Sequence, residues 1–409
     1  MVTWRRPTSD SAKTSDIDRR LQRAFEPGQL GSLTLRNRLI RTAAFEGMSP
    51  GGNVTPALIE HHRRMAAGGV GMTTVAYCSV SSDGRTFEHQ LWMRESLRRG
   101  LAELTRAVHD HGAAVSLQLG HAGSFASRAV TGSRPIAPAR TFNTYSLTWS
   151  RAMTGADLDR VREDFAKAAR WAREAGFDAI EIHAGHGYLL SQFLSPFTNP
   201  RRDGFGGDDP SRMRYPIEVL RGVREAVGDE YPIVVKTNLR DGFRGGLDLD
   251  TGVEVAARFA REGATALFLS GGFVSKTPFY MLRGPLPVRQ MVAAQRGVLR
   301  RAGLRVFGRF FVEEYPMRKL FFLEDARRVR AATTVPLILV GGIGSNDDIV
   351  QALEAGFEFV ALGRPLIFDP DFPSRLRRGE IRRTGCTYCN ECIAEMDRGG
   401  VRCTDPGAR

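Results

Sequence analysis

The sequence has no long apolar run, and this shortage excludes an integral membrane protein. Its longest apolar stretch, residues 335–340, is far shorter than the roughly 18 residues that a membrane-spanning helix needs. No apolar signal-peptide core follows Met1, and the first twenty residues are polar. We therefore expect a soluble, cytoplasmic protein with a loose N-terminal segment over residues 1–24.

Lysine is also scarce, with five lysines against 53 arginines, although the formal net charge is +13. The basic residues are spread along the chain, and no dense block of like charges with interleaved aromatic residues occurs. A solvated basic surface explains the charge better than a nucleic-acid groove does. We expect neither nucleic acid nor membrane as a partner, and the sequence leaves a homo-oligomer open.

Cysteine is rare over most of the chain. Cys78 stands alone, whereas Cys386, Cys389, Cys392 and Cys403 lie in the last 24 residues. This layout suits a reducing compartment and a metal or cluster motif better than a disulfide framework.

Eight short apolar runs are present, and a segment with helical periodicity follows each one. The predicted strands lie near residues 38–44, 70–77, 113–119, 178–183, 232–237, 265–270, 336–341 and 357–362. The predicted helices lie near residues 55–67, 97–111, 155–175, 211–227, 250–262, 321–332, 345–355 and 371–377. Strict alternation implies parallel strands, and eight units favour an α/β fold of the closed TIM (β/α)8 type.

No linker divides this pattern, so we expect a single barrel domain over residues 25–378 and a Cys-containing appendage over residues 379–409. Two long connections, residues 120–153 and 272–320, interrupt the regular alternation of strands and helices. Loops of that length in a compact domain commonly form lids or substrate walls.

Polar residues and glycines collect where the predicted strands end, which is the face that carries chemistry in such barrels. Gly341 and Gly342 follow the seventh strand, and Gly363 and Arg364 follow the eighth. Glycine lets a backbone approach an anion closely, and arginine adds a fork of donors. The pattern favours a phosphate site over turns that are merely tight.

His183, His186 and Tyr188 follow the fourth strand. Two histidines three residues apart are compatible with a metal site, with satisfied core histidines, or with two N–H donors on one substrate oxygen. Tyr188 adds a proton donor with an unperturbed pKa near ~10. Glu181 shares the strand face of His183, so a carboxylate role stays open.

The block from His183 to Gly207 resembles the Old Yellow Enzyme family of FMN-dependent oxidoreductases. Asn37-Arg38-Leu39-Ile40 and Leu-Gly-Arg364-Pro match the same family. The resemblance covers about residues 25–378. It implies a TIM barrel with FMN at its mouth and an NAD(P)H:flavin oxidoreductase, or ene-reductase, that reduces an activated C=C bond.

The resemblance also implies a role for each matching position. His183 and His186 would bind a substrate carbonyl oxygen, and Tyr188 would deliver a proton. The implied FMN-binding residues are Ala43 and Ala44 on the flavin face, Gln118 and Lys236 at the pyrimidine edge, and Gly341, Gly342, Gly363 and Arg364 at the phosphate.

Some positions depart from the family pattern. Glu46 stands roughly where many members carry Cys or Thr near a flavin carbonyl, and the place of Lys236 is often Arg.

The tail is similar to the branch containing 2,4-dienoyl-CoA reductase and trimethylamine dehydrogenase, which implies a 4Fe–4S cluster on the four tail cysteines. Reduced thiols without a metal remain the alternative.

Two other functions compete with the leading one. A dihydrouridine-synthase-like FMN barrel acting on tRNA would explain the basic charge, but it needs a catalytic cysteine, and Cys78 is poorly placed. The other alternative is a phosphate-binding barrel without redox chemistry.

Overall fold

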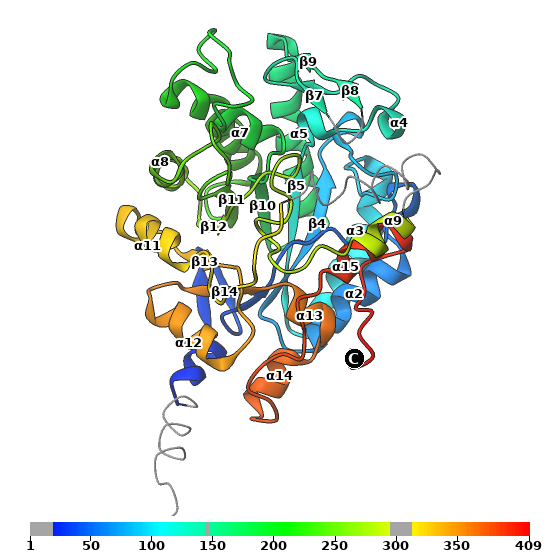
Figure 1. Ribbon diagram of the computed structural model, residues 1–409, viewed down its shortest axis with the longest axis vertical. Helices are drawn as coiled ribbons and strands as arrows, with labels where there is room; N and C mark the ends of the chain where they lie inside the picture. The colour runs from blue at the N-terminus through cyan, green and yellow to red at the C-terminus, as the bar shows by residue number, and fades with distance from the viewer. Residues whose placement is uncertain (1–18, 144–146, 295–312) are drawn as a thin grey trace, which may run out of the picture.

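The computed structural model describes residues 19–143, 147–294 and 313–409, and its centre is a closed barrel of eight parallel strands (Figure 1). The barrel strands are β3 (Leu39–Arg41), β4 (Met72–Ser79), β5 (Ala114–Gly120), β10 (Ala179–Ala184), β11 (Ile233–Asn238), β12 (Ala266–Ser270), β13 (Leu337–Leu339) and β14 (Phe359–Leu362). Each strand pairs with the next, and β14 closes the barrel by pairing with β3. The predicted TIM barrel is confirmed, and all eight predicted strands are present.

A helical segment follows every barrel strand, as the sequence predicts. The main helices are α2 (Pro56–Ala67), α3 (Arg98–His109), α5 (Gly155–Glu174), α7 (Asp209–Val227), α8 (Leu249–Arg261), α11 (Leu323–Ala332), α12 (Asn346–Glu354), α13 (Arg364–Phe368) and α14 (Phe372–Arg377). Thr154 caps α5 in a capping box with Asp157. Gly176, with a φ of 88°, takes the left-handed conformation that follows the end of that helix.

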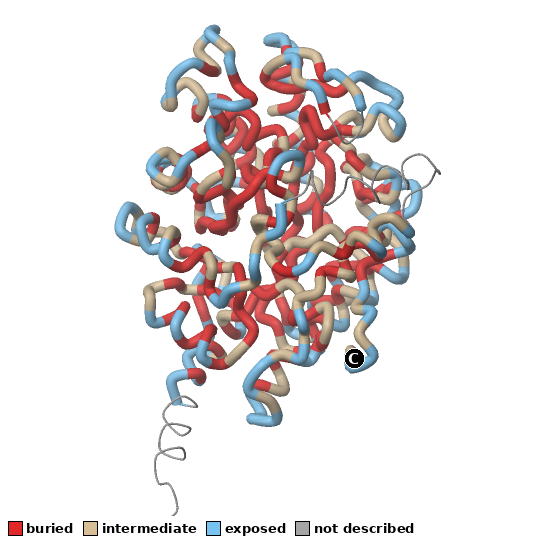
Figure 2. The backbone as a smooth tube through the Cα atoms, in the orientation of Figure 1, coloured by how far each residue is buried: buried red, intermediate tan, exposed pale blue. Residues whose placement is uncertain are grey.

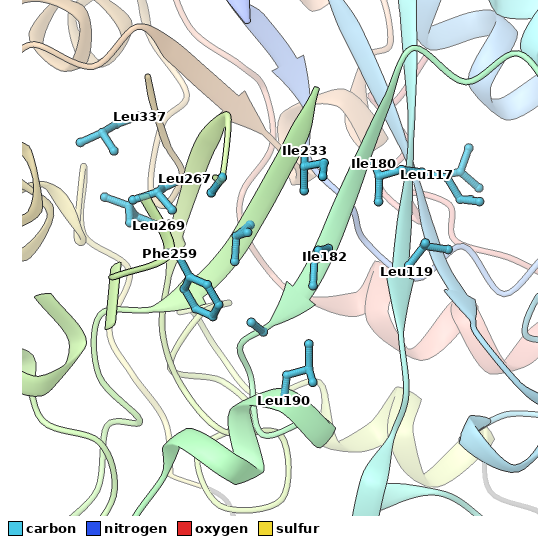
Figure 3. Close-up of a cluster of buried hydrophobic side chains, with 14 of the residues drawn as sticks. Leu117, Leu119, Ile180, Ile182, Leu190, Ile233, Phe259, Leu267, Leu269 and Leu337 are labelled. Carbon is cyan, nitrogen blue, oxygen red and sulfur yellow. The ribbon is translucent and has the colours of Figure 1, made fainter. Parts of the chain in front are cut away.

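Alternation along the strands separates two apolar layers. Outward-facing side chains such as Leu117 and Ile182 pack beneath the helices (Figure 3). Inward-facing side chains such as Val234 and Phe268 fill the barrel together with Leu30 of an N-terminal hairpin, β1 (Gly28–Leu30) and β2 (Leu33–Leu35). Buried residues therefore run through the strands, and exposed ones lie on the outer helices and loops (Figure 2). The hairpin closes the end of the barrel opposite the predicted site.

The connection over residues 120–153 carries short elements of its own. These are α4 (Arg128–Thr131), the parallel pair β6 (Ile136–Ala137) and β9 (Arg151–Ala152), and the antiparallel pair β7 (Phe142–Asn143) and β8 (Thr148–Trp149). The second predicted loop contains α9 (Val288–Ala294), and its residues 295–312 lie outside the described residues.

The cysteine-bearing tail packs on the barrel mouth. It includes α15 (Glu391–Glu395), which lies beside α9 (Figure 1). The Val401 N–H donates to the Glu46 carbonyl oxygen at 2.7 Å, and the Gly47 Cα approaches the Met396 backbone so closely that no Cβ would fit. The tail therefore supports the loop that follows β3.

Most of the predicted loose N-terminal segment, residues 1–18, lies outside the described residues. Residues 19–24 are helical, and Leu21 and Ala24 are buried. No helix in the described parts of the chain combines the length and apolarity that crossing a bilayer requires.

Candidate active site

The turn that follows β10 brings the three predicted catalytic residues together. The His183 ring centroid lies 5.0 Å from that of His186 and 4.7 Å from that of Tyr188. His186 has a φ of 59°, in the left-handed region that non-glycine residues rarely adopt. Its backbone N–H donates to Asn238 Oδ1 at 2.9 Å, which holds this conformation. Tyr188 is the N-cap of α6 (Leu189–Leu194).

His183 is buried and His186 is partly buried, and their removal from water decides their charge. Burial, with the neighbouring His186 and Lys236 charges, lowers the pKa of His183 well below its usual value. Burial, with Lys236, lowers the pKa of His186 to about 3. At neutral pH both rings are therefore uncharged, and each carries one N–H donor.

Neighbouring groups orient the two rings. The Gly185 N–H donates to His183 Nδ1 at 3.3 Å, which leaves the ring proton on Nε2. His186 Nε2 lies 2.7 Å from Ser270 Oγ, so Nδ1 is the nitrogen left for a ligand. The pair can thus present two neutral donors, and this favours oxygen binding over the other interpretations.

A buried polar cluster lies on adjacent strands of the barrel. Gln118 Nε2 donates to Glu181 Oε1 at 2.5 Å, and Lys236 Nζ lies 3.0 Å from the same oxygen. Lys236 Nζ also donates to Thr42 Oγ1 at 3.4 Å. Burial lowers the pKa of Lys236, whereas the Glu181 carboxylate opposes the shift. The structure therefore unites the predicted residues Gln118 and Lys236 and shows that Glu181 orients both.

Glu46 does not project freely toward a cofactor. Arg41 Nη1 donates to Glu46 Oε1 at 2.7 Å, and the Ala76 N–H donates to both carboxylate oxygens. Arg41 Nη2 also donates to the Ala44 carbonyl oxygen at 3.2 Å. This buried ion pair fixes the loop that carries Ala43 and Ala44, both of which stay partly exposed.

The glycines after β13 and β14 form a cradle of backbone donors. Gly341 and Gly342 have φ values of 108° and 70°, and a Cβ on Gly342 would collide with the Arg318 carbonyl oxygen. Within the described chain, the N–H groups of Gly341, Gly342 and Gly363 have no hydrogen-bond acceptor. Free N–H groups beside positive-φ glycines fit a phosphate.

Arg364 turns toward the tail. Its Nη1 donates to the Arg283 carbonyl oxygen at 2.7 Å and to Asn390 Oδ1 at 2.6 Å, and its guanidinium lies 4.8 Å from the Tyr388 ring centroid. The structure therefore connects Arg364 with the tail, and its predicted phosphate contact stays a prediction.

The four tail cysteines line one small cavity, together with Arg364 and Tyr388. All are free thiols, and burial raises the pKa of Cys392 to about 12. Among the residues that the structure describes, no three Cys, His, Asp or Glu side chains are close enough to share a metal ion. The four predicted sulfur ligands therefore line one cavity, but they do not lie in an arrangement that could coordinate a metal ion.

Sequence reasoning assigned no role to several residues that shape this site. Tyr77 lies beside Tyr188 with 5.0 Å between ring centroids, and Ser270 and Asn238 hold His186. Tyr77 and Ser270 lie at or near the ends of predicted strands, so a search of all strand ends for hydroxyl groups would have found them.

Neutral N–H donors and a buried lysine at one barrel mouth suit reduction of a polarised substrate by hydride transfer, which is the chemistry of an oxidoreductase. The chain belongs to the NADH:flavin oxidoreductase / NADH oxidase family, whose model matches residues 23–264. The resemblance to Old Yellow Enzyme is confirmed, and FMN and NAD(P)H are the cofactors of this family of enzymes.

Two relatives and one solved structure show what the chain is similar to. The chain is 41% identical to a 4,4'-dithiodibutanoate disulfide reductase of Rhodococcus erythropolis, covering 93% of the chain and 94% of that protein. It is 31% identical to an NADH oxidase of Thermoanaerobacter brockii over 90% of the chain, and it spans only 52% of that relative. A 2-naphthoyl-CoA reductase structure shares the fold, with a TM-score of 0.80 and 23% identity over 93% of this chain and 56% of that one.

Proposed function

We propose that the enzyme reduces a C=C bond conjugated with a carbonyl group, with NAD(P)H as the reductant. The observation that carries this proposal is the convergence of His183, His186 and Tyr188 beside the cluster of Gln118 and Lys236. Such a reduction requires donors that polarise the carbonyl, a source of hydride and a proton donor.

Each residue of the substrate set has a distinct task. His183 Nε2–H and His186 Nδ1–H donate to the carbonyl oxygen and withdraw electron density from the double bond. The β-carbon takes a hydride, and the α-carbon takes the Tyr188 proton. The C=C bond becomes a C–C single bond, and two C–H bonds form. Uncharged rings suit this role because they bind the oxygen without protonating it.

FMN, when bound, supplies the hydride. We propose that Ala43 and Ala44 lie along its ring face and that Gln118 and Lys236 bind its pyrimidine edge. The N–H groups of Gly341, Gly342 and Gly363 would hold the phosphate, with Arg364 adding positive charge.

A second candidate substrate is an organic disulfide. The relative named for disulfide reduction is 41% identical over nearly its whole length. Here hydride attack on one sulfur would break the S–S bond, and the departing thiolate would take the Tyr188 proton, giving two thiols. The histidine donors would then bind a polar group elsewhere on the substrate.

Anaerobic reduction and reoxidation of the purified flavoprotein tests these proposals. We expect heat-released FMN, reduction of the bound flavin by NADH or NADPH, and rapid reoxidation by enones or enoyl thioesters. Faster reoxidation by linear disulfides would favour the second substrate. Absence of flavin after reconstitution would contradict the proposal, and a gel shift with tRNA would favour the dihydrouridine-synthase alternative.

We further propose that the tail binds a 4Fe–4S cluster through Cys386, Cys389, Cys392 and Cys403. Arg364, beside these cysteines, would offset the negative charge of four thiolates. Free thiols throughout the chain also suit the cytoplasmic location that we propose.

Anaerobic purification should yield about four iron and four sulfide per chain, since this is the composition of a 4Fe–4S cluster. Cys389→Ser should lower both contents together, whereas Cys78→Ser, which changes a buried cysteine outside the tail, should lower neither. Zinc alone, or no metal in anaerobic protein, would leave the tail with a structural role.

A further inference from the structure

A group of buried hydroxyls lies behind Tyr188. Tyr77, on β4, is 3% exposed, and the neighbouring Tyr188 side chain opposes the rise in pKa that burial gives the Tyr77 hydroxyl. The two rings are 5.0 Å apart between centroids and inclined by 51°. The Tyr77 hydroxyl also lies 3.1 Å from Thr86 Oγ1. The Tyr77 ring therefore lies beside Tyr188, and its hydroxyl joins it to the loop after β4.

Gln90 adds a donor to this group. Its Oε1 accepts the N–H groups of Thr86 at 2.8 Å and Phe87 at 3.3 Å, so only its amide N–H groups remain for Tyr77. The Gln90 side chain is fully buried, and its Nε2 has no hydrogen-bond partner in the described structure. It lies near enough to the Tyr77 hydroxyl to oppose the rise in pKa that burial causes there. A buried N–H donor without a partner beside the two tyrosines favours negative charge on a nearby oxygen.

We propose that Tyr77 is a positioning residue for proton transfer, whose hydroxyl aligns the Tyr188 hydroxyl and stabilises the phenolate that forms when Tyr188 gives up its proton. In this step the Tyr188 O–H bond breaks, its proton joins the substrate, and the electron pair stays on the Tyr188 oxygen. On this proposal the Tyr77 O–H turns to donate to that oxygen as the charge forms, and the unpartnered Gln90 Nε2 donates to the Tyr77 oxygen. Solvent water returns a proton to Tyr188 after product leaves. The inference rests on the proposed function in one respect, because Tyr188 must be the proton donor.

The variant Tyr77→Phe keeps the ring and removes only the hydroxyl. We expect substrate reduction to slow by roughly 10- to 100-fold, the usual effect of removing a hydrogen bond to a charged group. Flavin reduction by NAD(P)H should not change. The alkaline limb of the pH profile of substrate reduction should move to higher pH, because a phenol that loses a donor gives up its proton less readily.

Two further variants separate this role from a structural one. Tyr215→Phe removes another buried hydroxyl, which donates to the Leu158 carbonyl oxygen at 3.0 Å, and it should leave both half-reactions and the pH profile unchanged. Thr86→Val should shift the pH profile in the same direction as Tyr77→Phe, but by less. It serves as the test should Tyr77→Phe fold poorly.

A double variant provides the decisive comparison. If Tyr77 acts through Tyr188, then Tyr77→Phe should cause no further slowing in a Tyr188→Phe background. Additional slowing there, or a Tyr77→Phe enzyme with wild-type rate and pH profile, overturns this inference and leaves the proposed function intact. If Tyr188→Phe itself has no effect on substrate reduction, both the inference and the proton donor of the proposed function are wrong.

Discussion

Tyr188→Phe should slow substrate reduction by ~10²–10⁴ while flavin reduction by NAD(P)H stays nearly unchanged, since a positioned general acid contributes about that factor. The substitution removes the proton donor and keeps the ring that contacts His183 at 4.7 Å between centroids. The hydride source and the two carbonyl donors are untouched. Stopped-flow measurement of the two half-reactions separately is the test.

The double variant His183→Ala/His186→Ala provides the contrast for this prediction. It leaves the proton donor in place but removes both N–H donors, so phenolic ligands and substrates should bind more weakly by ~1–3 kcal/mol for each donor lost. Equal slowing of both half-reactions by Tyr188→Phe, or slowing of neither, would contradict the role given to Tyr188.

Arg41→Met should destabilise the folded protein by about 3–5 kcal/mol at pH 8, the usual cost of leaving a buried charge without its partner. Arg41 and Glu46 are both 2% exposed and lie 2.7 Å apart between Nη1 and Oε1. Burial raises the pKa of Glu46 despite the nearby Arg41 charge. Urea unfolding at saturating FMN measures the change.

The loss of stability in Arg41→Met should be larger at high pH than at low pH. A carboxyl whose folded-state pKa lies above its unfolded value binds a proton more readily when folded, so its contribution to stability falls as pH rises through the folded pKa. Removing Arg41 raises the folded-state pKa of Glu46 further, so Arg41→Met should lose less stability at pH 5 than at pH 8. Adding Glu46→Gln to Arg41→Met should restore part of the lost stability.

A surface pair serves as the control. Arg99 is paired with Glu103 at 3.2 Å, but its side chain is 92% exposed. Arg99→Met should cost less than about 1 kcal/mol. An Arg41→Met protein as stable as this control at pH 8 would show that Glu46 does not need its partner.

The fold was predictable because it depends on local patterns. Apolar runs and periodic segments alternate eight times, and this order permits few architectures other than a closed parallel barrel. The start of α5 was also readable, since Thr154 and Asp157 satisfy each other's backbone over one turn. The hairpin of Leu30 and Leu35 was missed because three-residue strands leave too little alternation to detect.

The site was predictable where residues follow strand ends, and less so where distant segments meet. His183, His186 and Tyr188 lie within one turn, so their proximity follows from the sequence. The partner of Glu46 depends on how the segment after β3 folds back onto the barrel. Arg364 faces the tail because Asn390 and Tyr388 reach it from a separate part of the chain. Such long-range contacts have no signature in local spacing.

The left-handed backbone at His186 restricts how this enzyme can vary over evolution. A residue at this position must tolerate positive φ, and the proposed function also requires it to offer an N–H donor beside His183. Branched side chains fail the first condition, and glycine and aspartate fail the second. Asparagine meets both, since it adopts this conformation more readily than most residues and carries an amide N–H. Few residue types can therefore replace His186 and keep the function, although most positions in loops tolerate many substitutions.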